Sequence, residues 1–307
     1  MTQALVTPPD ASTTPLKFAD AGRTDLADLV DLERYPIHDP DSPAWADLIT
    51  RVKADLDRDG CSVLPAFLTG AGLAQAKQET NALAPKAFFQ HLRCNIYNTE
   101  PDDRLADDDP RQLFFERSSG FVTRDTIPAD TALQRIYVSP GMKRFVAECN
   151  DQPEVFEYAD PFAGLVINTM PPGTQQPWHY DTNEFITTIM TQSPDEGGVF
   201  QYCPNIRTPG NENLDGVGRV LRGDDTSPIK ELRLRPGDLQ MFRGRYSLHQ
   251  VSRVRGDTAR LTAVLAYAKK PGVVGPVERT RQLYGRVSEA HILAERAQAD
   301  SYDGLIR

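Results

Sequence analysis

The N-terminal half of the chain combines segments of helical hydrophobic periodicity with irregular polar stretches. Ser42-Pro43 is typical of a helix N-terminus, because the hydroxyl caps free N–H groups and proline fits the first turn. Apolar residues then recur at helical spacing as far as Gly60, a residue type that commonly ends helices. The recurring residues are Trp45, Leu48, Ile49, Val52 and Leu56. We expect a helix here, then a short strand over residues 61–65, and a second helix from Thr69 to about Ala84.

A third helix is expected from Ser139-Pro140, with apolar residues on one side. Residues 95–131 have no clear periodicity and are expected to be irregular. The aspartates within 102–109 form an acidic loop there, which is either a solvated surface or a cover for a site.

From about residue 155 the pattern changes to short apolar and β-branched runs that are separated by glycine- and proline-containing turns. The expected strands cover residues 165–170, 185–192, 199–202, 232–234, 239–242, 247–251 and 260–268. Short strands at regular spacing with such turns indicate a sandwich or jelly roll. A closing helix is expected over residues 287–298. The predicted fold class is therefore mainly β with flanking helices (α+β).

The pattern also suggests how the 307 residues are organised. Residues 1–20 are rich in Thr, Pro, Ala and Asp and are expected to form a flexible tail. Residues 21–307 are expected to form a single domain. Its expected parts are a mainly helical and loop segment (21–154), a β core (155–270) and a C-terminal helical extension (271–307).

The composition of the chain limits the classes of partner and the cellular location that we expect. Hydrophobic residues make up 39% of the chain, and no apolar run approaches the roughly 18 residues of a membrane span. The N-terminus lacks the features of a signal peptide, so a cytoplasmic location is expected. A net charge of −9 argues against nucleic acid and anionic membranes as partners. The four cysteines contain no C-x-x-C pair and are expected to be reduced, buried thiols.

The candidate chemistry begins at His179-Tyr180-Asp181, which is followed by His249. Residues i and i+2 of a strand share a face, so His179 and Asp181 would point to one place. Two imidazoles and one carboxylate are the ligands of the facial triad that holds Fe(II) and leaves positions open. A His-x-Asp triplet is a weak pattern alone, and its context decides whether it is a metal site.

Arg260 and Thr262 supply part of that context. On the strand expected at 260–268, both would share one face with Val264 and Ala266. A buried arginine needs a partner, and a guanidinium suits a carboxylate, to which a neighbouring hydroxyl adds a hydrogen bond. An internal ion pair or a solvent-exposed strand face would also explain Arg260.

The order of these motifs resembles that of the Fe(II)/2-oxoglutarate-dependent oxygenases, particularly a bacterial branch of specialised metabolism. The similarity spans roughly residues 95–270. The segments that carry it are Trp178–Phe185, Glu196–Tyr202, Arg235–Leu239 and Phe242–His249, preceded by Asp160-Pro161 and Ile167-Asn168. The resemblance implies a double-stranded β-helix, which is a cupin-like jelly roll, with Fe(II), the cosubstrate 2-oxoglutarate and O2.

The resemblance also implies residue roles. His179, Asp181 and His249 match the catalytic iron ligands, and Arg260 with Thr262 matches the pair that holds the distal carboxylate of 2-oxoglutarate. The site residues expected to line the cosubstrate pocket, unless they are core amides, are Asn168 and Gln192. The implied reaction hydroxylates an unactivated C–H bond and releases succinate and CO2. Family members that halogenate have a small residue in place of Asp181, so hydroxylation is favoured over halogenation.

Substrate recognition is the least defined part of the prediction. The candidate residues, each of which could equally be an ordinary surface or salt-bridge residue, are Asn183, Glu184, Arg117, Tyr97 and Arg243. We expect a small-molecule substrate that is polar and amino-acid-like, and the sequence indicates no oligomeric state. Desaturation or ring closure at the same iron remains open. A metal-binding cupin-like protein that does not use 2-oxoglutarate, or a non-catalytic binding or sensing domain, would also be compatible with the jelly-roll pattern.

Overall fold

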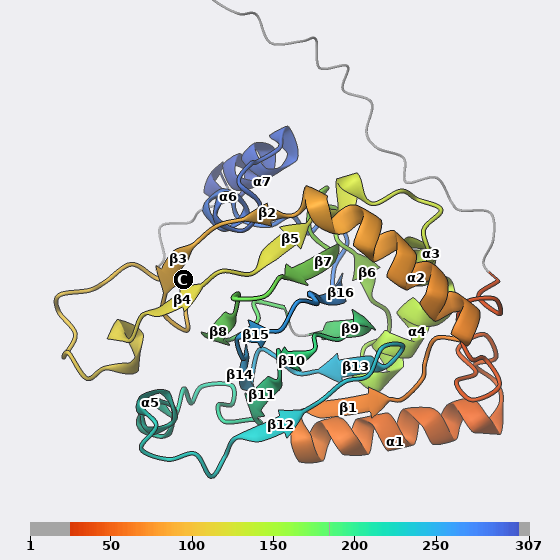
Figure 1. Ribbon diagram of the computed structural model, residues 1–307, viewed down its shortest axis with the longest axis horizontal. Coiled ribbons are helices and arrows are strands. Elements are labelled where there is room, and N and C mark those ends of the chain that lie inside the picture. The colour runs from red at the N-terminus through yellow and green to blue at the C-terminus, as the bar shows by residue number, and fades with distance from the viewer. Residues whose placement is uncertain (1–24, 184, 301–307) are drawn as a thin grey trace, which may run out of the picture.

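Two antiparallel sheets form the centre of the molecule (Figure 1). The computed structural model describes residues 25–183 and 185–300, so the tail expected at 1–20 and Glu184 lie outside the described residues. The strands of the larger sheet are β1 (Cys61–Leu64), β2 (Phe88–Phe89), β5 (Gly120–Val122), β6 (Phe156–Glu157), β7 (Leu165–Met170), β9 (Phe185–Gln192), β13 (Leu239–Phe242) and β16 (Arg260–Ala268). They run in the order β1-β13-β9-β16-β7-β5-β2, with β6 paired to β16.

The smaller sheet carries His179 and His249. Its strands are β8 (Gln176–His179), β11 (Phe200–Cys203), β12 (Lys230–Leu232) and β14 (Leu248–Val251), in the order β12-β11-β14-β8. Two short pairs complete the strands: β3 (Leu92–Cys94) with β4 (Phe115–Arg117), and β10 (Glu196–Gly197) with β15 (Val254–Arg255). The two main sheets form a jelly roll, as the sequence predicts.

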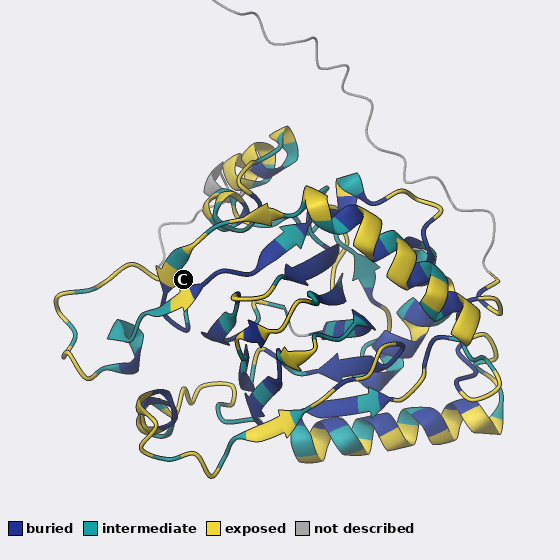
Figure 2. Ribbon diagram, viewed as in Figure 1, coloured by how far each residue is buried: buried dark blue, intermediate teal, exposed yellow. Residues whose placement is uncertain are grey.

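Helices cover one face of the larger sheet. The helices are α1 (Pro43–Asp59), α2 (Gly70–Leu83), α3 (Ala132–Val138), α4 (Pro140–Cys149), α5 (Leu214–Arg222), α6 (Val277–Tyr284) and α7 (Glu289–Asp300), with short 3-10 turns η1 (Ala84–Lys86), η2 (Pro110–Gln112) and η3 (Arg124–Thr126). The first four helices pack on the larger sheet through one apolar core, and α1 and α2 present their other side to solvent (Figure 2). None of the described helices is both long and apolar enough to cross a membrane.

Helix α1 forms where the hydrophobic spacing predicts it. The Ser42 hydroxyl accepts a hydrogen bond from the Trp45 N–H at 3.2 Å, which satisfies one free donor of the first turn. Trp45, Leu48, Val52 and Leu56 are buried. The helix ends at Gly60, whose φ of 62° lies in the left-handed region that glycine adopts without steric cost.

Strand β16 divides the interior of the molecule into a core face and a cavity face. Leu261, Ala263, Leu265 and Tyr267 are fully buried on the core face. Arg260, Thr262, Val264 and Ala266 line the cavity on the other face, as strand alternation predicts.

The prediction that residues 95–131 are irregular was wrong where the segment forms β4 and β5, and β5 extends the larger sheet beside β7. Three helices were not predicted. Helix α3 is short and mostly buried, so it shows no amphipathic stripe, and α5 contains two glycines. Helix α6 has no side-chain cap and buries only Thr280 and Tyr284.

Candidate active site

The two histidines lie directly opposite each other on neighbouring strands. In the β8–β14 register His179 pairs with His249, and their ring centroids are 4.1 Å apart. Nδ1 of His179 lies 2.7 Å from the Pro177 carbonyl oxygen, and Nδ1 of His249 lies 2.9 Å from that of Ser247. Each carbonyl accepts the Nδ1 proton, which leaves the Nε2 lone pair free for a metal.

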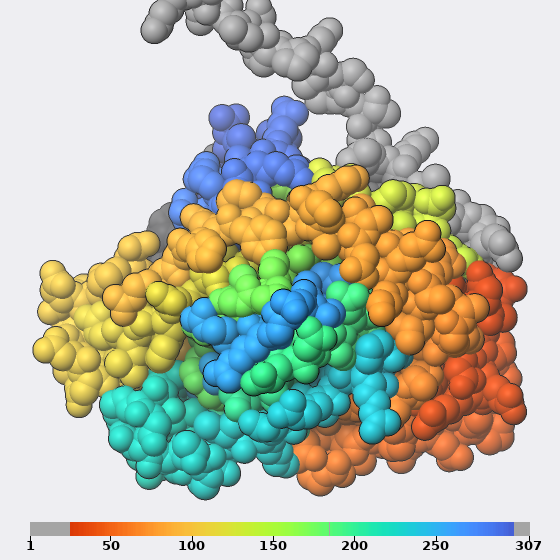
Figure 3. Space-filling view, viewed as in Figure 1, coloured from red at the N-terminus to blue at the C-terminus, as the bar shows by residue number. Residues whose placement is uncertain are grey.

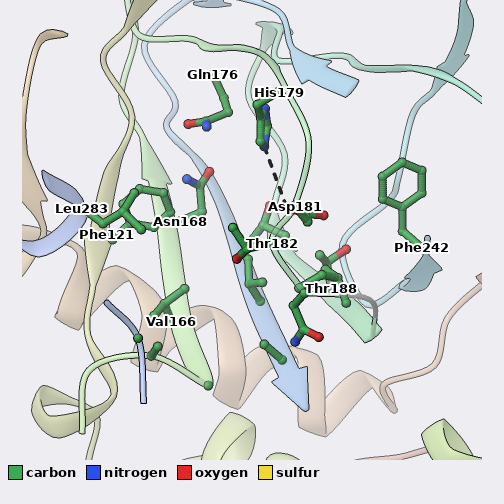
Figure 4. Close-up of a pocket in the computed structure, with 18 of the residues that line it drawn as sticks. Phe121, Val166, Asn168, Gln176, His179, Asp181, Thr182, Thr188, Phe242 and Leu283 are labelled. Carbon is green, nitrogen blue, oxygen red and sulfur yellow. Dashed lines mark ion pairs between the residues drawn. The ribbon is translucent and has the colours of Figure 1, made fainter. Parts of the chain in front are cut away.

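The carboxylate of Asp181 completes the group. Strand β8 ends at His179, and Asp181 is held beyond it by a 3.1 Å hydrogen bond from its N–H to the Gly244 carbonyl oxygen. Asp181 Oδ1 lies 3.9 Å from His179 Nε2 (Figure 4). Asp181 Oδ2 lies 3.5 Å from His249 Nε2. One ligand atom from each residue lies within 4.8 Å of the others, so the three side chains fit a single metal ion.

The protonation states suit metal binding. Burial lowers the pKa of His179 to about 3, and the neighbouring His249 contributes to the same shift. Burial alone would raise the pKa of Asp181, but the two histidines offset this effect and hold it below its usual range. At neutral pH His179 is therefore a neutral ligand and Asp181 an anionic one, as metal coordination requires.

A cavity of about 270 Å³ contains this group. It is lined by strands of both sheets, by the loop before β7 and by α6. Its lining includes Phe121, Tyr158, Asn168, Gln176, Thr188, Arg260, Thr262, Arg279, Leu283 and Tyr284. Figure 4 shows Asn168 and Gln176 near His179, with Phe121 and Leu283 farther to one side.

Arg260 enters the cavity without an acidic partner among the described residues. It is 4% exposed, and its Nη1 donates a 2.7 Å hydrogen bond to Thr262 Oγ1. Its Nε has no partner in the described part of the chain, and burial lowers its pKa to about 10. An uncompensated buried guanidinium is costly, so this site fits a ligand carboxylate. Asn168 faces the same cavity from β7, opposite Thr262 in the β7–β16 register.

The structure does not bring every predicted residue to the cavity. Gln192 bonds to the Asn81 side chain and the Ala259 carbonyl. Tyr97 donates from its hydroxyl to Glu212. Neither residue is among those that line the cavity.

Arg243 points toward the end of α1, where it pairs with Asp57 at 2.8 Å and donates to the Leu56 carbonyl. Asn183 does line the cavity, but its amide is already bonded to the Tyr267 carbonyl and the Phe185 N–H.

Two further arginines, Arg117 and Arg279, lie near each other on the α6 side of the cavity. Arg117 is 2% exposed, and its Nη2 donates to the Gln282 carbonyl at 3.2 Å, while its Nε and Nη1 have no partner among the described residues. Burial and the nearby positive charge of Arg279 lower the pKa of Arg117 to about 10. Arg279 lines the cavity itself, and the Asp181 carboxylate is close enough to influence its pKa. Arg117 itself is not among the residues that line the cavity, and its part in substrate recognition stays a prediction. Sequence reasoning missed Arg279.

Comparison with known proteins shows that the chain matches a known family. The family model described as "Halogenase D" matches residues 47–282. Comparison with curated proteins gives no match.

Among solved structures, the chain is similar to the non-heme alpha ketoglutarate dependent carbocyclase SnoK from nogalamycin biosynthesis, with a TM-score of 0.50 and 11% identity over 71% of this chain and 82% of that chain. It is also similar to AviO1 from Streptomyces viridochromogenes (TM-score 0.49, 16% identity, 71% and 94% covered). A third similar structure is a 2OG-Fe(II) oxygenase family oxidoreductase from Burkholderia pseudomallei (TM-score 0.46, 17% identity, 72% and 91% covered). The similarity to SnoK supports the jelly-roll fold, and the family match covers most of the chain. The protein therefore belongs to the Halogenase D family.

Proposed function

We propose that this protein is an Fe(II)- and 2-oxoglutarate-dependent oxygenase that hydroxylates an unactivated C–H bond of a small, carboxylate-bearing substrate. The observation that carries the proposal is Arg260, a buried guanidinium without an acidic partner among the described residues, in the cavity that contains the His179–Asp181–His249 group. A metal-binding protein that does not use 2-oxoglutarate has no need for such a charge beside the metal ligands.

Different residues of the chain would bind the iron and the cosubstrate. His179, His249 and Asp181 would hold Fe(II), and Arg260 with Thr262 would hold the distal carboxylate of 2-oxoglutarate. The bound iron, with 2-oxoglutarate and O2, supplies the oxidising power and releases succinate and CO2. The protein's own contribution is to orient the ligands and to exclude water, and the largely apolar cavity wall supports this role.

Asp181 favours hydroxylation over halogenation, although the family is named for a halogenase. Its carboxylate lies 3.9 Å from His179 Nε2 and 3.5 Å from His249 Nε2, so Asp181 would supply a metal ligand where halogenating relatives have a small residue. Desaturation and ring closure use the same set of metal ligands, and identifying the reaction product would distinguish them from hydroxylation.

The proposed substrate class follows from Arg117 and Arg279. Arg279 lines the cavity, and Arg117 lies close enough to add to the positive charge there. Neither is in an ion pair with a described acid, so this part of the cavity favours an anionic group, and Arg279 can donate to a carboxylate. Phe121, Tyr158 and Tyr284 offer aromatic surface for the carbon part of the substrate. An amino-acid-like compound combines these features. Asp160 is not free to bind an amine, because its oxygens already accept hydrogen bonds from Phe162, Ala163, Gly275 and His291.

The test is succinate release from 2-oxoglutarate by the Fe(II)-loaded protein under air, with a panel of free amino acids and their derivatives. We expect substrate-stimulated succinate release and a product about 16 mass units heavier by mass spectrometry, the mass of one oxygen atom gained from the iron-dependent reaction. Arg260→Ala should raise the KM for 2-oxoglutarate by at least about tenfold, because a charge-assisted hydrogen bond contributes about 1.5–3 kcal/mol.

The matched control is Arg255→Ala on β15, because Arg255 is exposed and pairs with Glu196 at the surface. Its KM for 2-oxoglutarate should equal that of the wild type. An unchanged KM in Arg260→Ala would instead favour a cupin-like protein that does not bind 2-oxoglutarate. A product that has lost two hydrogen atoms would indicate desaturation, and incorporation of chlorine would indicate halogenation.

A further inference from the structure

Gly244 forms the wall behind the Asp181 carboxylate. A Cβ atom at position 244 would lie 1.7 Å from Asp181 Oδ2 and 2.6 Å from its Cγ. No side chain larger than hydrogen fits there while the carboxylate keeps its place. Oδ2 is also the oxygen that faces His249 Nε2 at 3.5 Å, so the crowded atom belongs to the metal-binding arrangement.

The backbone does not explain this glycine. Gly244 is not among the glycines with positive φ, so an L-residue can adopt its conformation. The three described atoms that a Cβ at this position would approach most closely all belong to the Asp181 side chain. The neighbouring carboxylate is therefore the reason that this position lacks a side chain.

Hydrogen bonds restrict movement of the backbone around Gly244. The Arg243 N–H donates to the Gly60 carbonyl at 2.8 Å, and the Arg243 carbonyl accepts from Tyr246 and Ser247. The Gly244 carbonyl itself accepts the Asp181 N–H at 3.1 Å. A methyl group at 244 would consequently displace the carboxylate rather than the backbone.

We propose that Gly244 is a positioning residue that sets the orientation of the Asp181 carboxylate toward the metal. It has two effects on Asp181, because its carbonyl anchors the main chain and its missing side chain makes room for the carboxylate. The inference depends on Asp181 as a metal ligand, which is part of the proposed function.

The experiment measures Co(II) binding to the purified full-length apoprotein, without 2-oxoglutarate or substrate. We expect Gly244→Ala to raise the Kd for Co(II) by at least about tenfold, the range typical of changes to groups that orient metal ligands. Its visible absorption spectrum with Co(II) should shift toward that of Asp181→Gly. In the Asp181→Gly background, adding Gly244→Ala should change the Kd less than about twofold, because no carboxylate remains to be displaced.

Gly70→Ala is the matched control, because a Cβ at the start of α2 meets no atom within 4 Å and its backbone conformation is ordinary. Wild-type Co(II) affinity and spectrum in Gly244→Ala would overturn the inference while leaving the proposed function intact. A wild-type protein that fails to bind Co(II) would overturn both. If Gly244→Ala does not fold, a folded Asp181→Gly/Gly244→Ala double variant supports the inference, whereas an unfolded one overturns it.

Discussion

Arg117 and Arg279 bring two positive charges together in a largely buried setting, where like charges repel. The free protein tolerates this arrangement through hydrogen bonds to Gln282, whose carbonyl accepts from Arg117 and whose side chain accepts from Arg279. Such an arrangement favours the binding of an anion, because the anion relieves the repulsion as well as accepting hydrogen bonds.

Arg279→Met should therefore weaken binding of a carboxylate substrate while keeping a long side chain at the position, because Arg279 is the arginine of this pair that lines the cavity. We expect the KM for the substrate to rise at least about tenfold, since one charge-assisted hydrogen bond contributes about 1.5–3 kcal/mol. The KM for 2-oxoglutarate should not change. Steady-state kinetics with the best substrate of the amino-acid panel measures both values.

Arg281→Met is the control, because Arg281 lies on the same helix, α6, but is exposed. A substrate methyl ester that is turned over as efficiently as the free acid would argue against carboxylate recognition by this pair.

The residues of the metal site could be predicted because strand spacing and motif order both constrain them. Arg279 could not, because its place depends on how the C-terminal segment folds back over the cavity. The role of Gly244 could not be predicted either. The carboxylate oxygen for which it leaves room belongs to Asp181, which lies 63 positions earlier in the chain (244 − 181 = 63).

Among the helices, α6 lines the cavity, and α7 follows it along the chain and contacts it. They stand at one edge of the molecule, and α6 packs against β2 and β5 (Figure 3). His291 on α7 is fully buried, and its Nε2 lies 3.0 Å from Asp160 Oδ2. The Ser288 N–H donates to His291 Nδ1, so the imidazole carries its proton on Nε2 and donates it to Asp160. This bond ties α7 to the loop that lines the cavity.

His291→Ala should loosen that attachment. We expect the free energy of unfolding to fall by about 1–3 kcal/mol, because a buried acceptor loses a partner, although Asp160 keeps its backbone donors. Hydrogen exchange by mass spectrometry should show reduced protection in α6, and denaturant unfolding gives the stability change.

His38→Ala is the comparison variant, because His38 is exposed. Unchanged exchange in α6 of His291→Ala would show that Asp160 does not hold these helices in place.

The elements differ in how far the sequence predicts them. Helix α1 and strands β7, β9, β13 and β16 were predicted closely, because periodicity and turn residues agree there. Helices α3, α5 and α6 depend on tertiary contacts instead. Strands β2 and β5 are two or three residues long and exist only because the larger sheet extends to them.

For the whole molecule, the jelly roll follows from the run of short strands, but the contribution of the N-terminal part does not. A short strand is predicted where β1 lies, but not its pairing with β13, and β2 and β5 are not predicted at all; these three strands nevertheless form the two ends of the larger sheet. Such long-range pairings leave little trace in local sequence. The division of residues 21–307 into three parts of one domain stays a prediction.

The four cysteines report on the integrity of the folded molecule. All four are free and buried, and burial raises the pKa of each thiol, to about 11 for Cys61 and about 12 for Cys203. A raised pKa lowers the thiolate fraction at any given pH, so reactivity should be lower than that of an ordinary thiol and should increase only in strong alkali. We expect Ellman's reagent at about pH 8, close to the pKa of an ordinary thiol, to label essentially none in the native protein.

The same reagent should label four thiols after denaturation in guanidinium. Rapid labelling of any cysteine in the native state would contradict the packing of the element that carries it.

The close fit between Gly244 and Asp181 also constrains how such a site changes over evolutionary time. Loss of the carboxylate would remove the penalty on a methyl group at 244, so alanine could then accumulate there without harm. Once alanine was present at 244, its methyl group would clash with the carboxylate of an aspartate restored at 181. The order of two substitutions would then decide whether the change could be reversed, and a glycine retained at 244 keeps the return to a carboxylate-bearing metal site open.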